Sequence, residues 1–214
     1  MCTQILKPTM KRSRCEMESS SITEKAAKSM KRLTSDSPNS SLSPIDYLLH
    51  LSKATKQSSL EMKDFFHQYT EEEFESYTMD AAMAVRNLDL KKMKLLLSEG
   101  QLFQCCNRFG ESLINIACRR GSFEVVQFLT SEANVDINCL DDYGRTPLHD
   151  ACWSSEPNFD LIDLLITKSP ELLLMSDKRG HTPLDYTRKE HYQLWNNFLH
   201  KKEETLKALA TVSK

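Results

Sequence analysis

A short pattern centred on glycine occurs three times in this chain at a nearly constant spacing. Gly144 follows Gly110 by 34 residues, and Gly180 follows Gly144 by 36, with residues 107–117, 141–151 and 177–187 aligned around them. Upstream, Ala84 precedes Ala117 by 33 residues, and the apolar pattern of residues 92–96 matches that of 125–129. A period of 20–50 residues is typical of stacked repeats. We therefore divide this region into four units, at about 74–106, 107–140, 141–176 and 177–206.

Each unit is predicted to contain two short helices. Thr146 and Thr182 are good N-cap residues, each followed by a proline that suits the first helical position. The preceding glycines suit a turn that needs positive φ. In the third unit the apolar residues of the two helices are Leu148 and Ala151, then Leu161, Ile162, Leu164 and Leu165. Because one unit cannot cover its own apolar faces, the units should stack into a solenoid. Five Gly and seven Pro among 214 residues also favour helices over a turn-rich β fold.

These units resemble the ankyrin repeat family. Residues 146–151 read Thr-Pro-Leu-His-Asp-Ala and match the family's TPLHxA signature completely, residues 182–184 keep its first three positions, and residues 112–117 are a looser copy. Residues 135–138 resemble the segment that closes a repeat. The first unit lacks both the signature and the glycine, so its hairpin is left open. The resemblance implies an all-α solenoid of paired antiparallel helices joined by β-hairpin loops.

The segments outside the repeats divide by composition. Residues 1–43 are rich in Ser, Lys and Arg and are predicted to be disordered. Ser43 and Pro44 predict the start of a helix at about 44–52, an apolar pattern over 62–69 suggests another helix, and Thr70 with Glu73 predicts a capping box. We expect a helical lead-in over 44–73, a folded body beginning near Leu60, a repeat domain over 74–206 and a polar tail over 207–214. Residues 201–204 are expected to form an outward-facing cap on the last unit.

The charge is unevenly distributed along the chain. Residues 1–60 carry ten Lys and Arg against five Asp and Glu, whereas residues 61–214 carry eighteen against twenty-five. The basic run Lys11-Arg12-Ser13-Arg14, with Lys31-Arg32 further on, fits a nuclear import signal or a chance cluster. Ser37-Pro38 and Ser43-Pro44 are either sites of proline-directed phosphorylation or ordinary linker residues. No apolar run approaches the ~18 residues that span a bilayer, so we expect a cytoplasmic or nuclear protein.

No residue pattern points to catalysis, a cofactor or a metal. The seven cysteines include no CxxC pair and are expected to be reduced and mostly buried. His149, with Asp150 beside it and Cys152 nearby, invites a catalytic reading. The family resemblance instead implies that this His is a hydrogen-bonding strut between units, and that Cys118 and Cys152 fill a small-residue position in the core.

In ankyrin proteins the hairpin tips and the exposed faces of the first helices usually contact the partner. Carried over by position, this implies an unidentified protein partner, a chain that is monomeric in isolation, and a binding surface made of Arg108, Phe109, Glu111, Arg119, Arg120, Asp142, Tyr143, Arg145, Trp153, Ser154, Lys178, Arg179, His181 and Lys189. We expect the strongest contributions from Phe109, Tyr143, Trp153, Arg119 and Arg120, since aromatic residues and Arg dominate interface energetics. The alternative is that Phe109 or Trp153 simply packs between units and that the arginines form a solvated face.

A nucleic-acid-associated nuclear regulator is the second functional hypothesis. The basic head would act with a stripe of arginines, Arg108, Arg119, Arg120, Arg145 and Arg179, on the backbone phosphates. The net charge of −7 over residues 61–214 weighs against this hypothesis unless the charges segregate sharply.

Overall fold

The fold is described from a computed structural model, which covers residues 42–59, 61–207 and 209. The predictions of disorder over 1–43, of the basic import run and of phosphorylation at Ser37 concern residues almost entirely outside this range.

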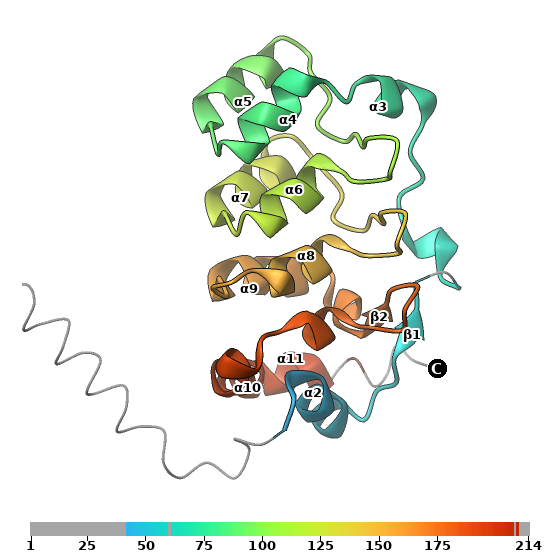
Figure 1. The fold of residues 1–214 in the computed structure, drawn as a ribbon, viewed down its shortest axis with the longest axis vertical. Coiled ribbons are helices and arrows are strands. Elements are labelled where there is room, and N and C mark those ends of the chain that lie inside the picture. The colour runs from blue at the N-terminus through green and yellow to red at the C-terminus, as the bar shows by residue number, and fades with distance from the viewer. Residues whose placement is uncertain (1–41, 60, 208, 210–214) are drawn as a thin grey trace, which may run out of the picture. The chain divides into compact units, whose positions relative to one another are not determined.

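Three helix pairs form the centre of the described chain (Figure 1). They are α4 (Met79–Arg86) with α5 (Leu90–Ser98), α6 (Leu113–Arg119) with α7 (Phe123–Ser131), and α8 (Pro147–Trp153) with α9 (Phe159–Lys168). Side-chain oxygens cap the N-termini of most of these helices by accepting a backbone N–H three residues on; the capping residues are Thr78, Asp89, Ser112, Ser122 and Asn158. The repeated pairs predicted from the sequence are confirmed, including the pair in the first unit.

Contacts between successive units form one continuous core. Helix α6 packs between α4 and α8, and α7 packs against α9. The side chains at these contacts are fully buried, and they include Ile114, Leu148, Leu129 and Ile162. Cys118 and Cys152 are also buried, as core-filling residues should be, and all five cysteines in the described range are free thiols. Each unit is therefore stabilised by burying its apolar faces against its neighbours.

The fourth unit departs from the prediction. Its signature forms only a 3-10 turn, η3 (Pro183–Tyr186), where the third unit has the α-helix α8. Asp185 accepts hydrogen bonds from the backbone N–H and the hydroxyl of Thr182, and Thr187 turns extended with its hydroxyl donating to the Leu184 carbonyl. The chain therefore leaves the helical path after one turn. It continues through η4 (Lys189–His191) into α10 (Tyr192–Lys201) and α11 (Glu203–Lys207).

The helix predicted near residue 44 is confirmed, but its position in space was not foreseen. Helix α2 (Pro44–Ser52) begins at Ser43, whose hydroxyl oxygen accepts the N–H of Asp46. It packs against α10, α11 and η3, at the far end of the stack from the first unit. Ile45 and Leu48 are buried there, so the core begins at Ile45 rather than near Leu60. Residues 201–204 were expected to form the cap on the last unit. In the structure, α2 covers this end of the stack together with α11.

The chain returns from α2 to the first unit along the hairpin turns (Figure 1). Strand β1 (Gln57–Ser58) pairs in parallel with β2 (Met175–Ser176), which follows the 3-10 helix η2 (Pro170–Leu174). The hydroxyl of Ser59 then donates to the Gly144 carbonyl, and the N–H of His67 donates to the Asn138 carbonyl. We call residues 53–70 the return segment.

The described residues of the return segment form no α-helix. Only η1 (Lys63–Phe65) forms where the sequence suggested a helix over 62–69, because this stretch lies extended beside the turns and buries Phe66 against them. The capping box predicted at Thr70 and Glu73 is confirmed, and it begins α3 (Glu71–Glu75). The first unit lacks the glycine hairpin turn of the later units, and helix α3 occupies that place.

Candidate protein-binding surface

Three hairpin turns have the same local structure. In each, one side-chain oxygen accepts two backbone N–H groups, at positions two and four residues on: Asn107, Asp141 and Asp177 play this part. The glycines adopt φ of 70°, 74° and 79°, as predicted. At Gly144 a side chain would also meet the Ser59 hydroxyl at 2.9 Å, so the return segment adds a second reason for glycine there.

The turns are joined to one another through the backbone. The N–H of Asp142 donates to the Phe109 carbonyl at 3.0 Å, and the N–H of Lys178 donates to the Tyr143 carbonyl at 2.9 Å. Phe109 and Tyr143 thus occupy equivalent places in successive turns, as their position before the glycines predicted. These two residues are 55% and 57% exposed, so neither is buried between units.

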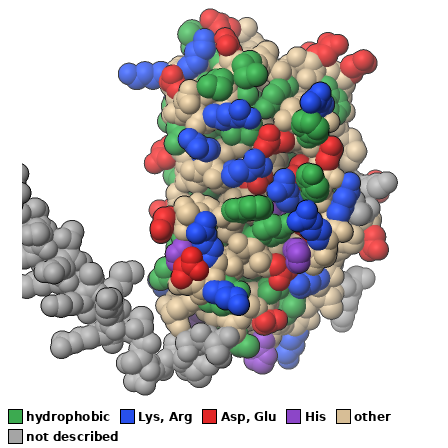
Figure 2. Space-filling view, in the orientation of Figure 1, with side chains coloured by type: hydrophobic (Ala, Val, Ile, Leu, Met, Phe, Trp, Pro, Cys, Tyr) green, Lys and Arg blue, Asp and Glu red, His purple; other side chains and the backbone are tan. Residues whose placement is uncertain are grey.

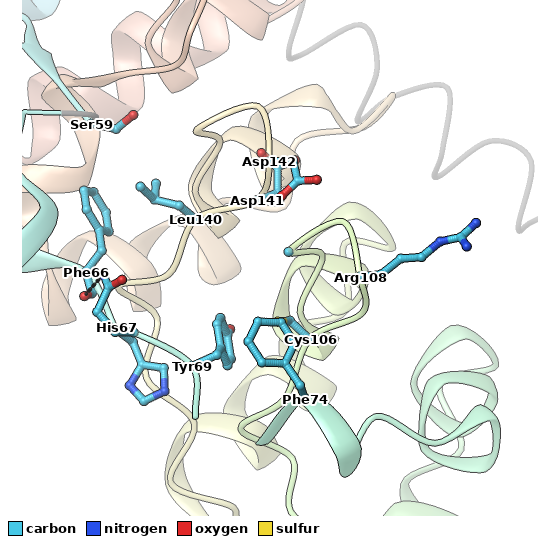
Figure 3. A pocket seen from close by; sticks show the side chains of 12 residues that line it. Ser59, Phe66, His67, Tyr69, Phe74, Cys106, Arg108, Leu140, Asp141 and Asp142 are labelled. Carbon is cyan, nitrogen blue, oxygen red and sulfur yellow. Dashed lines mark hydrogen bonds between the residues drawn. The ribbon is translucent and has the colours of Figure 1, made fainter. Parts of the chain in front are cut away.

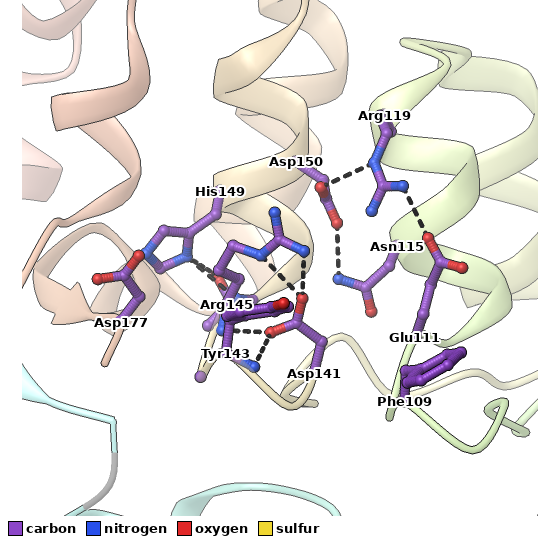
Figure 4. A network of polar contacts seen from close by, with 12 residues as sticks. Phe109, Glu111, Asn115, Arg119, Asp141, Tyr143, Arg145, His149, Asp150 and Asp177 are labelled. Carbon is purple, nitrogen blue, oxygen red and sulfur yellow. Dashed lines mark hydrogen bonds and ion pairs between the residues drawn. The ribbon is translucent and has the colours of Figure 1, made fainter. Parts of the chain in front are cut away.

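An arginine lies over each aromatic tip. The Arg108 guanidinium is 4.6 Å from the centre of the Phe109 ring, and that of Arg145 is 5.2 Å from the centre of the Tyr143 ring. Arg145 also donates from Nε and Nη2 to Asp141 Oδ2, at 2.8 and 2.6 Å (Figure 4). Because Asp141 also orders the turn backbone, Tyr143 is held on a rigid base.

Arg119 is committed to an internal network rather than free for a partner. Its Nε donates to the buried Asp150 at 3.0 Å and its Nη1 donates to Glu111 at 2.7 Å, while Asn115 donates to the other oxygen of Asp150 (Figure 4). Burial raises the pKa of Asp150, which Arg119 and Asn115 partly offset. Arg119 therefore links the second and third units. The two roles considered for it from the sequence, partner contact and solvated side chain, do not include this link.

Trp153 lies at the exposed end of α8, as predicted, with 52% of its surface accessible. Its structural counterpart in the second unit is Arg119, the last residue of α6. The indole stacks on the ring of Tyr186 in the next unit, with ring centres 5.6 Å apart and an interplanar angle of 24°. Trp153 is thus half in contact with the fourth unit and half open.

His149 bridges the third and fourth units. Its Nδ1 accepts the backbone N–H of Thr146 at 3.0 Å, so its Nε2 carries the proton and donates to the His181 carbonyl at 3.1 Å. This is the strut that the family resemblance implied. Burial lowers the pKa of His149 to about 4, because protonation would charge a buried ring and remove its acceptor for Thr146.

This bridge should make stability depend on pH. In the unfolded chain His149 takes up a proton below pH about 6.5, whereas in the folded chain it does so only near pH 4. The unfolded state therefore binds more protons between these values, and the bridge's contribution is lost as the pH falls through this window. Compared with His149→Gln, the natural chain should lose up to about 1.4 kcal/mol more per pH unit. Urea unfolding of both chains at several pH values measures this, and equal slopes would contradict it.

The remaining predicted residues are spread over the same face. Arg120, Asp142, Lys178, Arg179, His181 and Lys189 are exposed, while Glu111 and Ser154 are half-buried. Figure 2 shows that Lys and Arg side chains intermingle with exposed apolar side chains across the middle of this face. We call the hairpin tips, together with the exposed residues of α6, α8 and η3 and of the few residues that follow each of them, the candidate surface.

Sequence reasoning missed the contribution of two residues to this surface. Tyr186 stands where the signature has a variable position, and its role becomes visible only once the fourth unit's first helix is seen to stop there. Arg188 follows that stop and returns toward Trp153. The departure of residues 185–187 from the signature was the available signal for both.

A cavity of about 450 Å³ lies between the return segment and the turns (Figure 3). Side chains from both sides line it, including Phe66, His67, Tyr69, Phe74, Cys106, Arg108 and Leu140. Burial raises the pKa of the Cys106 thiol to about 12, so this thiol is protonated and a weak nucleophile at neutral pH. In the described part of the chain, no group of three or more His, Cys, Asp or Glu side chains is placed to hold a metal ion. The helices of that part also include none long and apolar enough to cross a membrane.

The fold and this surface define a helical repeat solenoid whose linked hairpin tips and first helices form an open face. Residues 79–175 match the family model for ankyrin repeats in three copies. This part of the chain therefore consists of ankyrin repeats, which are generally protein-interaction modules. The matched residues end before the fourth unit, in agreement with its shortened first helix.

Two relatives show the same likeness over half of the chain. The human SMC5-SMC6 complex localization factor protein 1 is 31% identical over 121 residues, which cover 50% of this chain and 11% of that protein. The ankyrin repeat protein YahD of Escherichia coli strain K12 is 28% identical over 112 residues, covering 50% of this chain and 54% of YahD. The chain thus matches about a tenth of the first relative and about half of the second.

Proposed function

We propose that this chain is an adaptor that binds a protein partner through the candidate surface and has no catalytic role. The carrying observation is that Phe109, Tyr143 and Trp153 are all about half exposed on one rigid face, although large aromatic side chains are mostly buried. Exposed aromatics beside arginines are the composition expected at the centre of a protein interface. The binding set remains as assigned from the sequence, with Arg119 as a support of that surface.

The proposed setting is the cytoplasm or the nucleus. One relative is described as a localization factor for a protein complex, which supports a role in bringing proteins together. The chain is proposed to be a monomer in isolation. Proximity labelling with the tagged full chain would name the partner, and the purified partner can then be measured against variants.

Nucleic acid is the less favoured partner. A stripe of five arginines was the basis of that hypothesis, yet Arg119 and Arg145 are bound to carboxylates at ion-pair distance. Pairing reduces the charge that remains to neutralise phosphates. Binding measured at two salt concentrations separates the hypotheses, since phosphate contacts weaken steeply as salt rises.

Removing an exposed aromatic side chain from the candidate surface should weaken partner binding with little loss of stability. Tyr143→Ala and Trp153→Ala are each expected to lower the partner affinity by about 1–3 kcal/mol. Trp153→Ala should also cost about 0.5–1.5 kcal/mol of folding stability through loss of its ring stack on Tyr186. The measurements are the melting midpoint and the partner affinity of each variant.

Leu95→Ala is the matched control, because Leu95 is an exposed apolar residue of α5, outside the candidate surface. It should change neither quantity. If both aromatic variants stay folded and bind normally, the partner uses another surface. If Trp153→Ala unfolds the chain, Trp153 is a core residue and the surface loses its anchor.

A further inference from the structure

The early end of the fourth unit's first helix leaves a hollow beside α8. Six residues line it, and its volume is about 360 Å³. They are Trp153, Arg179, His181, Asp185, Tyr186 and Arg188. In the third unit the first helix runs on to Trp153, whereas in the fourth it stops at Tyr186, so no described residue covers the outer half of the indole. We call this space the Trp153–Tyr186 hollow.

The wall of the hollow is rigid. Trp153 and Tyr186 stack on each other, and the rings of His149 and His181 each make a T-shaped contact with the ring of Tyr186. The Tyr186 hydroxyl donates to Asp177 at 2.6 Å, which fixes the ring to the hairpin turn. A ligand that packs on these rings would not have to order them first, so less binding energy is lost.

The carboxylates near the hollow are already bound by neighbouring groups. Asp185 accepts from Thr182 and pairs with Lys56 at 2.9 Å, and these contacts hold the pKa of Asp185 below its usual range despite burial. Asp177 accepts two backbone N–H groups and the Tyr186 hydroxyl, and its pKa is lowered in the same way. Both carboxylates therefore remain charged and point toward internal donors.

The positive charges of the guanidinium groups in the hollow are largely unpaired within the described residues. Within the described residues, the Arg179 side chain has no carboxylate at ion-pair distance, and Arg188 has only Glu190, at 3.9 Å and with both side chains largely exposed. Such exposed pairs contribute little. The hollow therefore combines an aromatic wall with two arginines that can each donate a pair of parallel N–H groups.

We infer that the Trp153–Tyr186 hollow binds an anionic side chain, a carboxylate or a phosphate monoester, of a protein segment lying on the candidate surface. This inference rests on the proposed function and names the chemistry of the partner. The guanidinium groups would hold the anion, and the aliphatic part of the side chain would pack on the indole. A protein segment is favoured over nucleic acid, because the two uncommitted arginines line a single hollow while two members of the wider stripe are paired.

Trp153 can report binding directly. The chain has two tryptophans, and Trp195 is buried. A Trp195→Phe background, checked for folding by circular dichroism, isolates the Trp153 emission, and the natural chain followed by NMR serves if that background does not fold. The probes are three capped peptides, Ser-Gly-X-Gly-Ser, in which X is Glu, phosphoserine or Gln.

We expect the Glu or the phosphoserine peptide to bind saturably and at least ten times more tightly than the Gln peptide. The tighter of the two identifies the anion. Arg179→Gln with Arg188→Gln should weaken that binding about tenfold or more, as loss of charge-assisted hydrogen bonds predicts. Arg86→Gln, which removes one positive charge at an exposed position of α4, should leave it unchanged.

Four results would overturn the inference. Equal binding of the Gln peptide would show that the anion is not recognised. Full binding by the double Arg variant would place the anion elsewhere. Nucleic acid would be favoured if a deoxythymidine ten-mer binds more tightly than either anionic peptide and if Arg86→Gln weakens its binding as much as the double Arg variant does. If Tyr143→Ala loses the identified partner while the double Arg variant keeps it, the proposed function stands and this inference fails.

Discussion

Leu48→Ala should destabilise the C-terminal end of the repeat stack, although Leu48 itself lies on the N-terminal side of the repeats. Leu48 is fully buried where α2 meets the C-terminal helices, so removing its side chain leaves a cavity. The expected loss in the free energy of unfolding is about 2–5 kcal/mol. Chemical denaturation measures the loss, and hydrogen exchange should show that protection falls first in α10 and α11.

The reason for this effect is that α2 acts as the terminal cap of the solenoid. The ends of a repeat stack need a cover, because the last unit has no neighbour to bury its apolar face. Here the cover comes from the N-terminal side, where Tyr47 contacts His200 and Asn196 donates to the Leu42 carbonyl. A chain that starts at residue 60 would lose this cover and the β1 pairing together.

Leu95→Ala is again a suitable control, since Leu95 is half exposed in the first unit. Its effect on stability should be small. A Leu48→Ala loss below about 0.5 kcal/mol would fall within the range of an ordinary surface substitution. In that case α2 contributes little to the stability of the last unit, and a chain that starts at residue 60 should fold as well as the full chain.

Local signals in the sequence predicted most of the repeat structure. Caps, prolines and turn glycines act within a few residues, which is why the start of α2, the capping box at Thr70 and the turns at Gly110 and Gly144 were all read correctly. The exposure of Phe109 and Tyr143 followed from the same local geometry, since the position before a turn glycine lies at the hairpin tip.

The features that were missed depend on contacts between distant parts of the chain. Nothing in residues 44–52 encodes which end of the stack α2 covers, because an apolar helix face fits several partners equally well. The apolar residues of 62–69 resemble a helix, yet they are explained by packing against turns more than 40 residues away, such as the contact of His67 with Asn138. Asp150 and Tyr186 likewise acquire their roles only from the adjacent units.

Leu148→Ala is expected to lower the free energy of unfolding by about 2–4 kcal/mol. Leu148 belongs to α8, which packs against α6 on one side and η3 on the other, and its side chain is fully buried. Because the substituted residue lies in the central interfaces, the cavity should weaken the coupling of the units on both sides. Denaturant titration gives the free energy, and a shallower or biphasic transition would report the loss of coupling.

Leu164→Ala provides the comparison within the same unit, because Leu164 in α9 is only partly buried. Its loss should be clearly smaller than that of Leu148, since part of its side chain already contacts water and the truncated site can fill with solvent. Which of the two variants loses more stability matters more than either value, because this comparison tests whether the apolar residues of the signature face the neighbouring units. A Leu148→Ala effect below about 0.5 kcal/mol, or one smaller than that of Leu164→Ala, would show that stability does not come from the interfaces between units.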